Sequence, residues 1–398
     1  MTEIVLSDRV NAIKPSPTLA VTNKAAELKA AGKDIIGLGA GEPDFDTPEF
    51  AKQAAIDAIN AGFTKYTAVD GIPELKKAII DKFKRDNGLD YKADQILVSC
   101  GGKQSFFNMA QAFINPGDEV IIPAPYWVSY PDMVLIAGGV PVIVKCEEEA
   151  QFKITPEQLK AAITPKTKLL VINSPSNPTG MIYTKEELLA LAEVLKANPH
   201  VFIATDDMYE HIRWTGEDFD NIVSVCPELY DRTLVLNGVS KAYAMTGWRI
   251  GYAAGPEKLI KAMKKVQSQS TSNPTSISQK AAVAALNGDQ SVLEPMIEAF
   301  KRRHDLVVEG LNAIPGISCL PADGAFYAYA NIKSLIKAAG MSSCTEFSNW
   351  LLENAGVAVV PGDAFGLGGY MRISYATGDS VLTEALARIK KATAVLEV

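Results

Sequence analysis

Seven short apolar segments, separated by helical patterns, run through residues 94–255 and constrain the fold of this 398-residue chain more than any other feature. The segments are Gln95–Ser99, Glu119–Ile122, Val140–Val144, Lys168–Ile172, Val201–Ala204, Thr233–Leu236 and Arg249–Ala254. Near-continuous apolar runs rich in Val, Ile and Leu are typical of strands that helices cover on both faces. We therefore predict an α/β fold with a mostly parallel, seven-stranded sheet covered by helices.

The remainder of the chain predicts a second, smaller domain. A long helical pattern runs from Pro256 past Arg303, and strands are expected at Gly324–Ala330 and Tyr370–Tyr375, which indicates an α+β unit. We expect three parts. They are an N-terminal segment (residues 1–47) that packs with the small domain and a partner subunit, a large domain (48–290) and a small C-terminal domain (291–398).

Composition excludes several classes of function. A net charge of -7 with scattered basic residues argues against nucleic acid as a partner. The five cysteines form no CxxC pair, so neither a disulfide framework nor a zinc site is expected, and a reducing cytoplasm fits best. Only three histidines are present, and we expect no metal. No leader or membrane-spanning segment is expected, because no uncharged apolar run is long enough.

Lys241 and Arg249 form the most suggestive pair of charged residues. Lys241 follows the strand Thr233–Leu236, which Asn237-Gly238 is expected to end, and Arg249 comes a short turn later. A lysine amine forms a Schiff base with an aldehyde when burial or a nearby cation lowers its pKa, and an arginine binds phosphate bidentately. This spacing predicts a site for a covalent aldehyde cofactor that carries a phosphate.

Polar residues also follow other predicted strands, where the ligands of open α/β sheets gather. Gly102 and Lys103 open a predicted helix, and a helix N-terminus favours phosphate. Asn177 lies in a proline-rich turn and offers an amide to a phenolic oxygen. Asp206 and Asp207 offer a carboxylate to a protonated pyridine nitrogen, and we expect one of them to be paired and the other solvated.

Three further side chains complete the candidate site. Tyr209 can donate to the same phenolic oxygen, Trp127 can stack on a planar ring, and Arg372 interrupts an apolar strand where it can bind an α-carboxylate. Core packing explains Tyr209 and Trp127 singly, and a protein carboxylate is an equally ordinary partner for Arg372. Together they outline a site for pyridoxal phosphate.

These motifs resemble those of the fold-type I pyridoxal-phosphate aminotransferases of class I, and most closely the bacterial aspartate aminotransferases of the beta subgroup. The resemblance runs nearly end to end. It rests on Gly39–Pro48, Tyr66 with Gly71–Leu75, Gly101–Gln104, Pro125–Tyr130, Asn177–Gly180, Asp206–Tyr209, Ser240–Tyr252 and Gly324–Tyr327.

The resemblance implies a role for each matching residue around the cofactor. Lys241 is implied to bind the cofactor covalently and to move the proton, Asp206 to pair with the pyridinium, and Asn177 and Tyr209 to hold the ring oxygen. The residues implied to surround the phosphate are Gly102, Lys103, Ser240, Arg249 and, from the partner subunit of a homodimer, Tyr66. On the substrate side, Trp127 is implied to stack, Arg372 to bind the α-carboxylate and the Gly41 backbone to close over it.

Two departures from the family pattern leave questions for the structure. Many relatives carry a phosphate-binding serine where this chain has Gly238, and Ser240 is the candidate to compensate. No counterpart is evident for the arginine that reads the distal carboxylate in the alpha subgroup, so we expect Lys103, Ser16 and Thr18 to take that role.

The function implied is transfer of the amino group from L-aspartate to 2-oxoglutarate, giving oxaloacetate and L-glutamate. An alternative within the fold is another acceptor, such as prephenate, an aromatic keto acid or alanine, with Lys14 admitting a larger carboxylated ring. A non-catalytic regulator and a β-eliminating lyase are further alternatives. A regulator is disfavoured because the chain has no additional basic domain.

Overall fold

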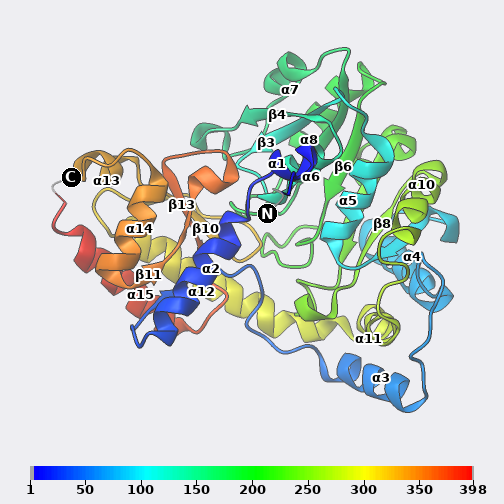
Figure 1. The fold of residues 1–398 in the computed structure, drawn as a ribbon, viewed down its shortest axis with the longest axis horizontal. Helices are drawn as coiled ribbons and strands as arrows, with labels where there is room; N and C mark the ends of the chain where they lie inside the picture. Colours follow the sequence, from blue (N-terminus) through cyan, green and yellow to red (C-terminus); the bar gives the residue numbers. More distant parts are fainter. Residues whose placement is uncertain (1–3, 397–398) are drawn as a thin grey trace.

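The computed structural model describes residues 4–396 and contains a seven-stranded sheet at its centre (Figure 1). The strand order is β2-β8-β7-β6-β5-β3-β4. These strands are β2 (Ile96–Ser99), β3 (Glu119–Ala124), β4 (Val140–Lys145), β5 (Thr167–Asn173), β6 (Phe202–Asp206), β7 (Thr233–Gly238) and β8 (Gly251–Ala254). Strand β8 runs antiparallel to both of its neighbours, β2 and β7, and the other pairs in this sheet are parallel. The predicted α/β class and the mostly parallel seven-stranded sheet are confirmed.

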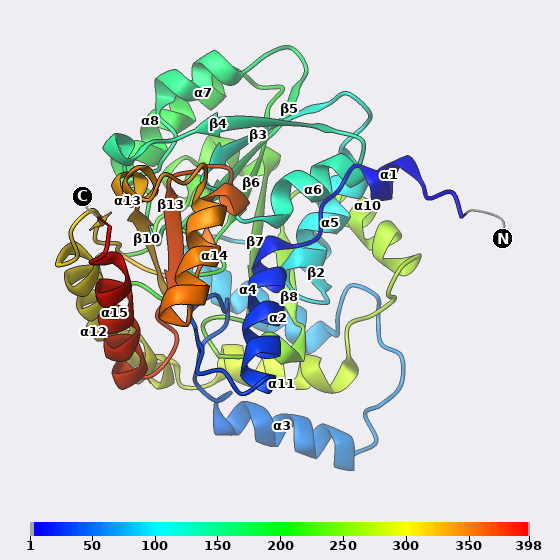
Figure 2. The same cartoon turned by 60° about the vertical axis from the view of Figure 1, so that its left-hand side comes forward.

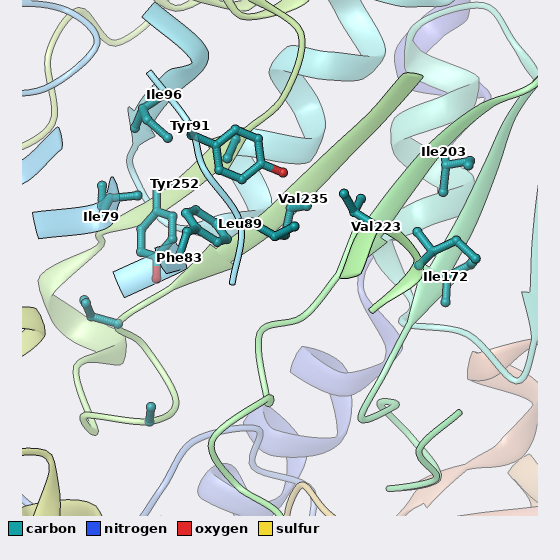
Figure 3. Close-up of a cluster of buried hydrophobic side chains, with 14 of the residues drawn as sticks. Ile79, Phe83, Leu89, Tyr91, Ile96, Ile172, Ile203, Val223, Val235 and Tyr252 are labelled. Atoms are coloured by element: carbon teal, nitrogen blue, oxygen red, sulfur yellow. The ribbon is translucent and has the colours of Figure 1, made fainter. Parts of the chain in front are cut away.

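Helices cover both faces of this sheet because successive side chains of each strand point to opposite faces. In β7, Val235 joins one apolar cluster, whereas Leu234 and Leu236 join another. The first cluster includes helices α4 (Pro73–Asn87), α8 (Lys185–Lys196) and α11 (Ser276–Asn287), and the second includes α5 (Gly102–Phe113), α6 (Ser129–Ile136) and α10 (Glu257–Ser268). Figure 3 shows the first cluster, where Phe83 of α4 lies edge-on to Tyr252 of β8 with ring centroids 5.9 Å apart.

A smaller four-stranded antiparallel sheet has the order β12-β13-β10-β9. Its strands are β9 (Ser318–Cys319), β10 (Tyr327–Asn331), β12 (Val360–Pro361) and β13 (Tyr370–Ser374). Its apolar cluster includes residues of helices α12 (Glu294–Asn312), α13 (Lys333–Ala338), α14 (Cys344–Ala355) and α15 (Asp379–Thr393). Other helices are α1 (Asp8–Asn11), α3 (Glu49–Asn60), α7 (Pro156–Ala162) and α9 (Ile222–Val225).

The N-terminal segment packs against the smaller unit. Helix α2 (Pro17–Ala30) places Ala25 in a small apolar cluster with Ile35 and Ala358, and β1 (Ile36–Gly37) pairs in parallel with β11 (Val357–Ala358). In Figures 1 and 2, α2 lies between α14 and α5. These contacts support the division that we propose, with residues 48–290 as the large domain, 291–398 as the small domain and 1–47 packed on the latter.

The structure corrects three local expectations. Strand β7 continues through Gly238, so Asn237-Gly238 does not end it. Arg249 lies outside β8 in the left-handed region, with a φ of 56°. The long helical pattern after Pro256 is divided into α10, α11 and α12. Within residues 4–396, no helix has the length and apolar character needed to cross a membrane.

Candidate active site

A cavity of about 460 Å³ opens beyond the carboxyl ends of the central strands. Asn173 ends β5, Asp206 ends β6 and Lys241 follows β7, so the topology brings these side chains to one edge of the sheet. The predicted residues that line the cavity are Ser16, Thr18, Gly41, Gly102, Lys103, Trp127, Asn177, Asp206, Tyr209, Ser240, Lys241, Arg249 and Arg372. Four lysines and arginines against two carboxylates, Glu42 and Asp206, give its wall a positive excess.

Lys241 lies in a tight turn directly after β7. The turn is closed by a hydrogen bond from the Met245 backbone N–H to the Ser240 carbonyl, 3.1 Å long. The Nζ of Lys241 donates to the Gly41 carbonyl oxygen and lies 5.9 Å from the centre of the Tyr209 ring. The N-terminal segment and the turn after β6 therefore enclose the amine.

The surroundings of Lys241 favour its neutral form. Burial is the largest cause, and the positive charges of Arg372 and Arg249 act in the same direction, so that the pKa of Lys241 falls to about 8. A lysine nucleophile needs a lowered pKa, because only the neutral amine attacks a carbonyl. The amine is thus prepared for covalent chemistry near neutral pH.

A glycine-lined cradle faces the Arg249 guanidinium. Gly101 has a φ of +88°, and a Cβ at this position would lie 2.2 Å from Nη2 of Arg249. A Cβ at Gly251 would lie 2.2 Å from the backbone nitrogen of Gly102. Helix α5 begins at Gly102, and the first N–H groups of a helix lack intrahelical acceptors and favour phosphate. Backbone donors and a guanidinium therefore meet where larger side chains would not fit.

Hydrogen bonds from separate parts of the chain hold the carboxylate and the backbone carbonyl of Asp206. The Tyr130 hydroxyl donates to Oδ2 (2.5 Å), the Met208 backbone N–H donates to Oδ1 (3.3 Å), and Nδ2 of Asn173 donates to the Asp206 carbonyl oxygen (2.8 Å). Burial raises the pKa of Asp206, and the bond from Tyr130 opposes that rise. The carboxylate is oriented in the cavity wall, as pairing with a protonated ring nitrogen requires.

The expectation that Asp206 or Asp207 would be solvated is wrong. Asp207 is 1% exposed, and its carboxylate accepts from the Thr205 hydroxyl (2.6 Å) and from Nδ2 of Asn221 (2.8 Å). Burial, together with the negative charge of Glu210, raises the pKa of Asp207 to about 7. Asp207 is therefore buried beside the half-buried Asp206, and its high pKa relieves its repulsion with Glu210.

Arg372 is buried in the small-domain wall of the cavity. Its Nη1 donates to Oδ1 of Asn177 (2.8 Å) and its Nη2 to the Gly39 carbonyl (2.7 Å), while Tyr327 lies under the guanidinium at 4.5 Å. Its Nε has no hydrogen-bond partner among residues 4–396. A buried donor without an acceptor is costly, so the cavity side of Arg372 suits an anionic ligand. The Tyr327 and Tyr209 hydroxyls share a hydrogen bond of 2.9 Å.

Lys103 lies in the first turn of α5, and its Nζ is 5.1 Å from the centre of the Trp127 ring. Burial and the charge of Arg249 lower the pKa of Lys103. Ser16 is the N-cap of α2, and Thr18 lies in the first turn of that helix. The structure thus brings Lys103, Ser16 and Thr18 to one cavity.

Two of the predicted residues lie outside the cavity. The structure also explains why this chain has Gly238 where many relatives carry a serine. The Tyr66 side chain is 89% exposed, and Lys14 is also exposed. At Gly238 a Cβ would lie 3.0 Å from the Ile250 carbonyl oxygen, so a larger side chain would have to displace backbone. Ser240, by contrast, lines the cavity and is the nearby hydroxyl.

Sequence reasoning missed part of the lining. The additional residues are Leu19, Thr22, Ala40, Glu42, Val128, Asn173, Met208, Thr246 and Tyr327. Most lie within motifs that the family resemblance already singled out, but no role had been assigned to them. Tyr130, which supports Asp206 from α6, was also unassigned, because its partner is 76 residues away in the sequence.

The donor set fits pyridoxal phosphate. A glycine cradle with Arg249 matches a phosphate, the Asp206 carboxylate matches a pyridinium, and the Lys241 amine matches an aldehyde. The fold and this site define an α/β protein with a cavity that suits an aldehyde cofactor bearing a phosphate.

Comparison with known proteins gives the family. Residues 33–389 match the family model described as aminotransferase class I and II. The chain belongs to this family, and the prediction of a class I, fold-type I aminotransferase is confirmed.

Curated relatives and solved structures agree along almost the whole chain. The chain is 62% identical over 390 residues to the aspartate/prephenate aminotransferase of Nitrosomonas europaea, covering 96% of this chain and 98% of the relative. The crystal structure of the aspartate aminotransferase from Rhizobium meliloti has a TM-score of 0.96 at 53% identity, covering 99% of this chain and 100% of that chain. The aspartate aminotransferase from Thermus thermophilus with maleate has a TM-score of 0.93 at 46% identity, covering 98% and 100%.

Proposed function

We propose that this aminotransferase uses pyridoxal phosphate to transfer the amino group of L-aspartate to 2-oxoglutarate, giving oxaloacetate and L-glutamate. The observation that carries the proposal is a buried Lys241 amine with a pKa of about 8 in a cavity whose lysines and arginines outnumber its carboxylates. The names of the relatives support aspartate as the donor. The Thermus relative was solved with maleate, which like aspartate carries two carboxylates.

When bound, pyridoxal phosphate supplies an aldehyde that joins the substrate nitrogen and a ring that accepts electrons from Cα. The chain supplies the proton transfer. The Lys241 Nζ takes the proton from the substrate Cα, and its lowered pKa suits a general base near neutral pH. Asp206 would pair with the ring nitrogen and keep it protonated, while Tyr209 and Asn177 would hold the ring oxygen.

The two ends of the substrate are assigned to opposite walls. Arg372 binds the α-carboxylate through the donors that the protein leaves free, and the Gly41 backbone lies beside it. Lys103, with the hydroxyls of Ser16 and Thr18, binds the distal carboxylate. A lysine binds as a point charge and not as a bidentate fork, so the distal site admits acids of more than one length. Trp127 stacks on the cofactor ring.

The phosphate lies, in this proposal, against the N-terminus of α5, where Gly102, Lys103, Ser240 and Arg249 meet. Tyr66 reaches the site of a second copy, which its 89% exposure permits. We therefore propose a homodimer with shared sites. A cytoplasmic location is supported by the five cysteines, all of which are free thiols in the described part of the chain.

A panel of amino donors and keto-acid acceptors tests the proposal, with the visible absorbance of the lysine-bound cofactor followed in parallel. We expect the highest kcat/KM for aspartate with 2-oxoglutarate. Prephenate is the second candidate acceptor, because the Nitrosomonas relative is named for it. A purified protein that binds no pyridoxal phosphate, or that releases pyruvate from cysteine conjugates faster than it transaminates, would exclude the assignment.

A further inference from the structure

A fully buried ion pair lies beneath the active site and has no part in the chemistry proposed above. Lys82 of α4 is 0% exposed, and its Nζ donates to Oε1 of Glu210 and to Oδ1 of Asn87, the latter at 2.8 Å. Glu210 is also buried and follows Tyr209 directly. A buried charge is retained only when it is paired and hydrogen-bonded, because its desolvation is costly.

Glu210 connects three separate elements through its two carboxylate oxygens. Its Oε1 accepts from Nδ2 of Asn237 (2.7 Å) as well as from Lys82, and its Oε2 accepts from Nδ2 of Asn87 (2.8 Å). Asn237 lies in β7, four residues before Lys241, and its own Oδ1 accepts from the Gly238 backbone N–H (2.7 Å). One carboxylate thus joins α4, the turn after β6 and the end of β7.

The two segments joined by Glu210 carry the central residues of the proposed reaction. The turn after β6 contains Asp206 and Tyr209, and the segment after β7 contains Lys241. Helix α4, which supplies Lys82, is itself fixed on the sheet by the apolar cluster around Phe83 (Figure 3). The ion pair therefore transmits the rigidity of a packed helix to both segments.

Other charged groups surround the pair. Asp86 lies 3.9 Å from Lys82 and is bonded to Arg85 and His211, whose Nδ1 is 3.7 Å from Glu210. Asp86, Glu210 and His211 have ligand atoms within 4.8 Å of one another, a spacing that also suits a metal ion. The Lys82 ammonium already pairs with Glu210 at this position. It therefore supplies the positive charge that a metal ion would otherwise bring to the cluster.

We propose that Lys82 and Glu210 are positioning residues of this aminotransferase: through Asn237, the pair holds the Lys241 segment against the turn that carries Asp206 and Tyr209. This positioning role rests on the function proposed above for Lys241, Asp206 and Tyr209. Neither Lys82 nor Glu210 lines the cavity, so both act through other residues.

The first test replaces Lys82 by Met in the full-length protein, with Lys76→Met as the matched control. Lys76 lies on the same helix, is also buried, and pairs with Asp70 away from both segments. Hydrogen–deuterium exchange of peptides 205–212 and 236–243 is measured with and without pyridoxal phosphate. In Lys82→Met we expect both peptides to exchange faster by roughly tenfold or more, because the buried Glu210 carboxylate loses its ammonium partner.

The double variant Lys82→Met with Glu210→Gln tests the same role by rescue. Loss of Lys82 frees Oδ1 of Asn87, so that a flipped Asn87 amide can accept from the Gln side chain, which can in turn accept from Asn237. A neutral, satisfied network should return both exchange rates to within about threefold of the unmodified protein. The dissociation constant of the cofactor should rise in Lys82→Met and return toward the value of the unmodified protein in the double variant.

A milder variant keeps the proposal testable if Lys82→Met fails to fold. Asn237→Ala cuts the link to the Lys241 segment and leaves the ion pair intact, so we expect faster exchange in peptide 236–243 and little change in 205–212.

The proposal is overturned if Lys82→Met exchanges like Lys76→Met in both peptides, or if Asn237→Ala changes neither. Absence of turnover with aspartate in the unmodified protein would contradict the proposed function instead, since the exchange comparison without cofactor does not depend on it.

Discussion

The Tyr130 hydroxyl donates to the half-buried Asp206 carboxylate and favours its charged form, and its removal has a calculable effect. Tyr130 is itself buried, and its ring packs against Phe106 and Trp127 with centroids 4.9 and 5.1 Å away. Tyr130→Phe therefore deletes one hydroxyl without opening space for a rearranged ring. It leaves Oδ2 of Asp206 without its 2.5 Å hydrogen bond.

The magnitude follows from the strength of a hydrogen bond to a charged group. Such a bond contributes about 1.5–3 kcal/mol to the charged form, so its loss should raise the pKa of Asp206 further. Burial already raises this pKa above its usual value. A carboxylate is protonated as the pH falls through its pKa. Because the pKa of Asp206 is higher in the variant, its pairing with a protonated ring nitrogen is lost at a higher pH.

The assay is the dissociation constant of pyridoxal phosphate as a function of pH. In Tyr130→Phe, binding should weaken at a higher pH than in the unmodified protein, because the charged form of Asp206 has lost about 1.5–3 kcal/mol. Tyr126→Phe is the control, because Tyr126 lies four residues away and makes no hydrogen bond to Asp206. Identical binding profiles for Tyr130→Phe and the unmodified protein would refute this account of Asp206.

Three further predictions concern single positions. Lys241→Ala should bind pyridoxal phosphate without the absorbance of the lysine adduct and lose turnover by several orders of magnitude; near-normal turnover would contradict the role of Lys241. Asp207 has a pKa of about 7 in the folded protein. Its contribution to stability is therefore full below the unfolded pKa of about 4 and is lost as the pH rises through 7, a change of about 4 kcal/mol. Denaturant unfolding at pH 4 to 8 should show this loss relative to Asp207→Asn, and parallel pH profiles would contradict it. Gly238→Ser should lower the free energy of unfolding by about 1–3 kcal/mol, since a Cβ there meets backbone at 3.0 Å. Gly247→Ser, where nothing lies within 4 Å, should be nearly neutral, and equal stability of the two variants would show that Gly238 is not constrained.

The central sheet was predictable from the sequence, because each buried strand is a local apolar run. All seven predicted segments overlap the observed strands, with ends that differ by a few residues, as at Gly238. The positions of Lys241, Asp206 and Asn177 at one edge were predictable for the same reason, since parallel strands end on the same side of a sheet. Recognition of the motifs then supplied a role for each residue.

The partners of these residues were not predictable, because they come from distant parts of the chain. The Lys82–Glu210 pair joins residues 128 positions apart, as counted from their numbers, and the bond from Arg372 to Asn177 spans 195 positions. No local pattern marks such contacts. Asp207 illustrates the consequence, because its burial could be judged only once Thr205 and Asn221 were known to satisfy it.

The sequence by itself determined the α/β class, the order of the strands along the chain and the residue types at the strand ends. These features follow from the spacing of apolar residues and from the strand boundaries, and a few neighbouring residues set both. The tertiary structure decided which charges are buried and which are paired, and with them the pKa values of Lys241 and Asp207. Desolvation and pairing depend on everything that packs around a group, and that is fixed only when the whole chain has folded.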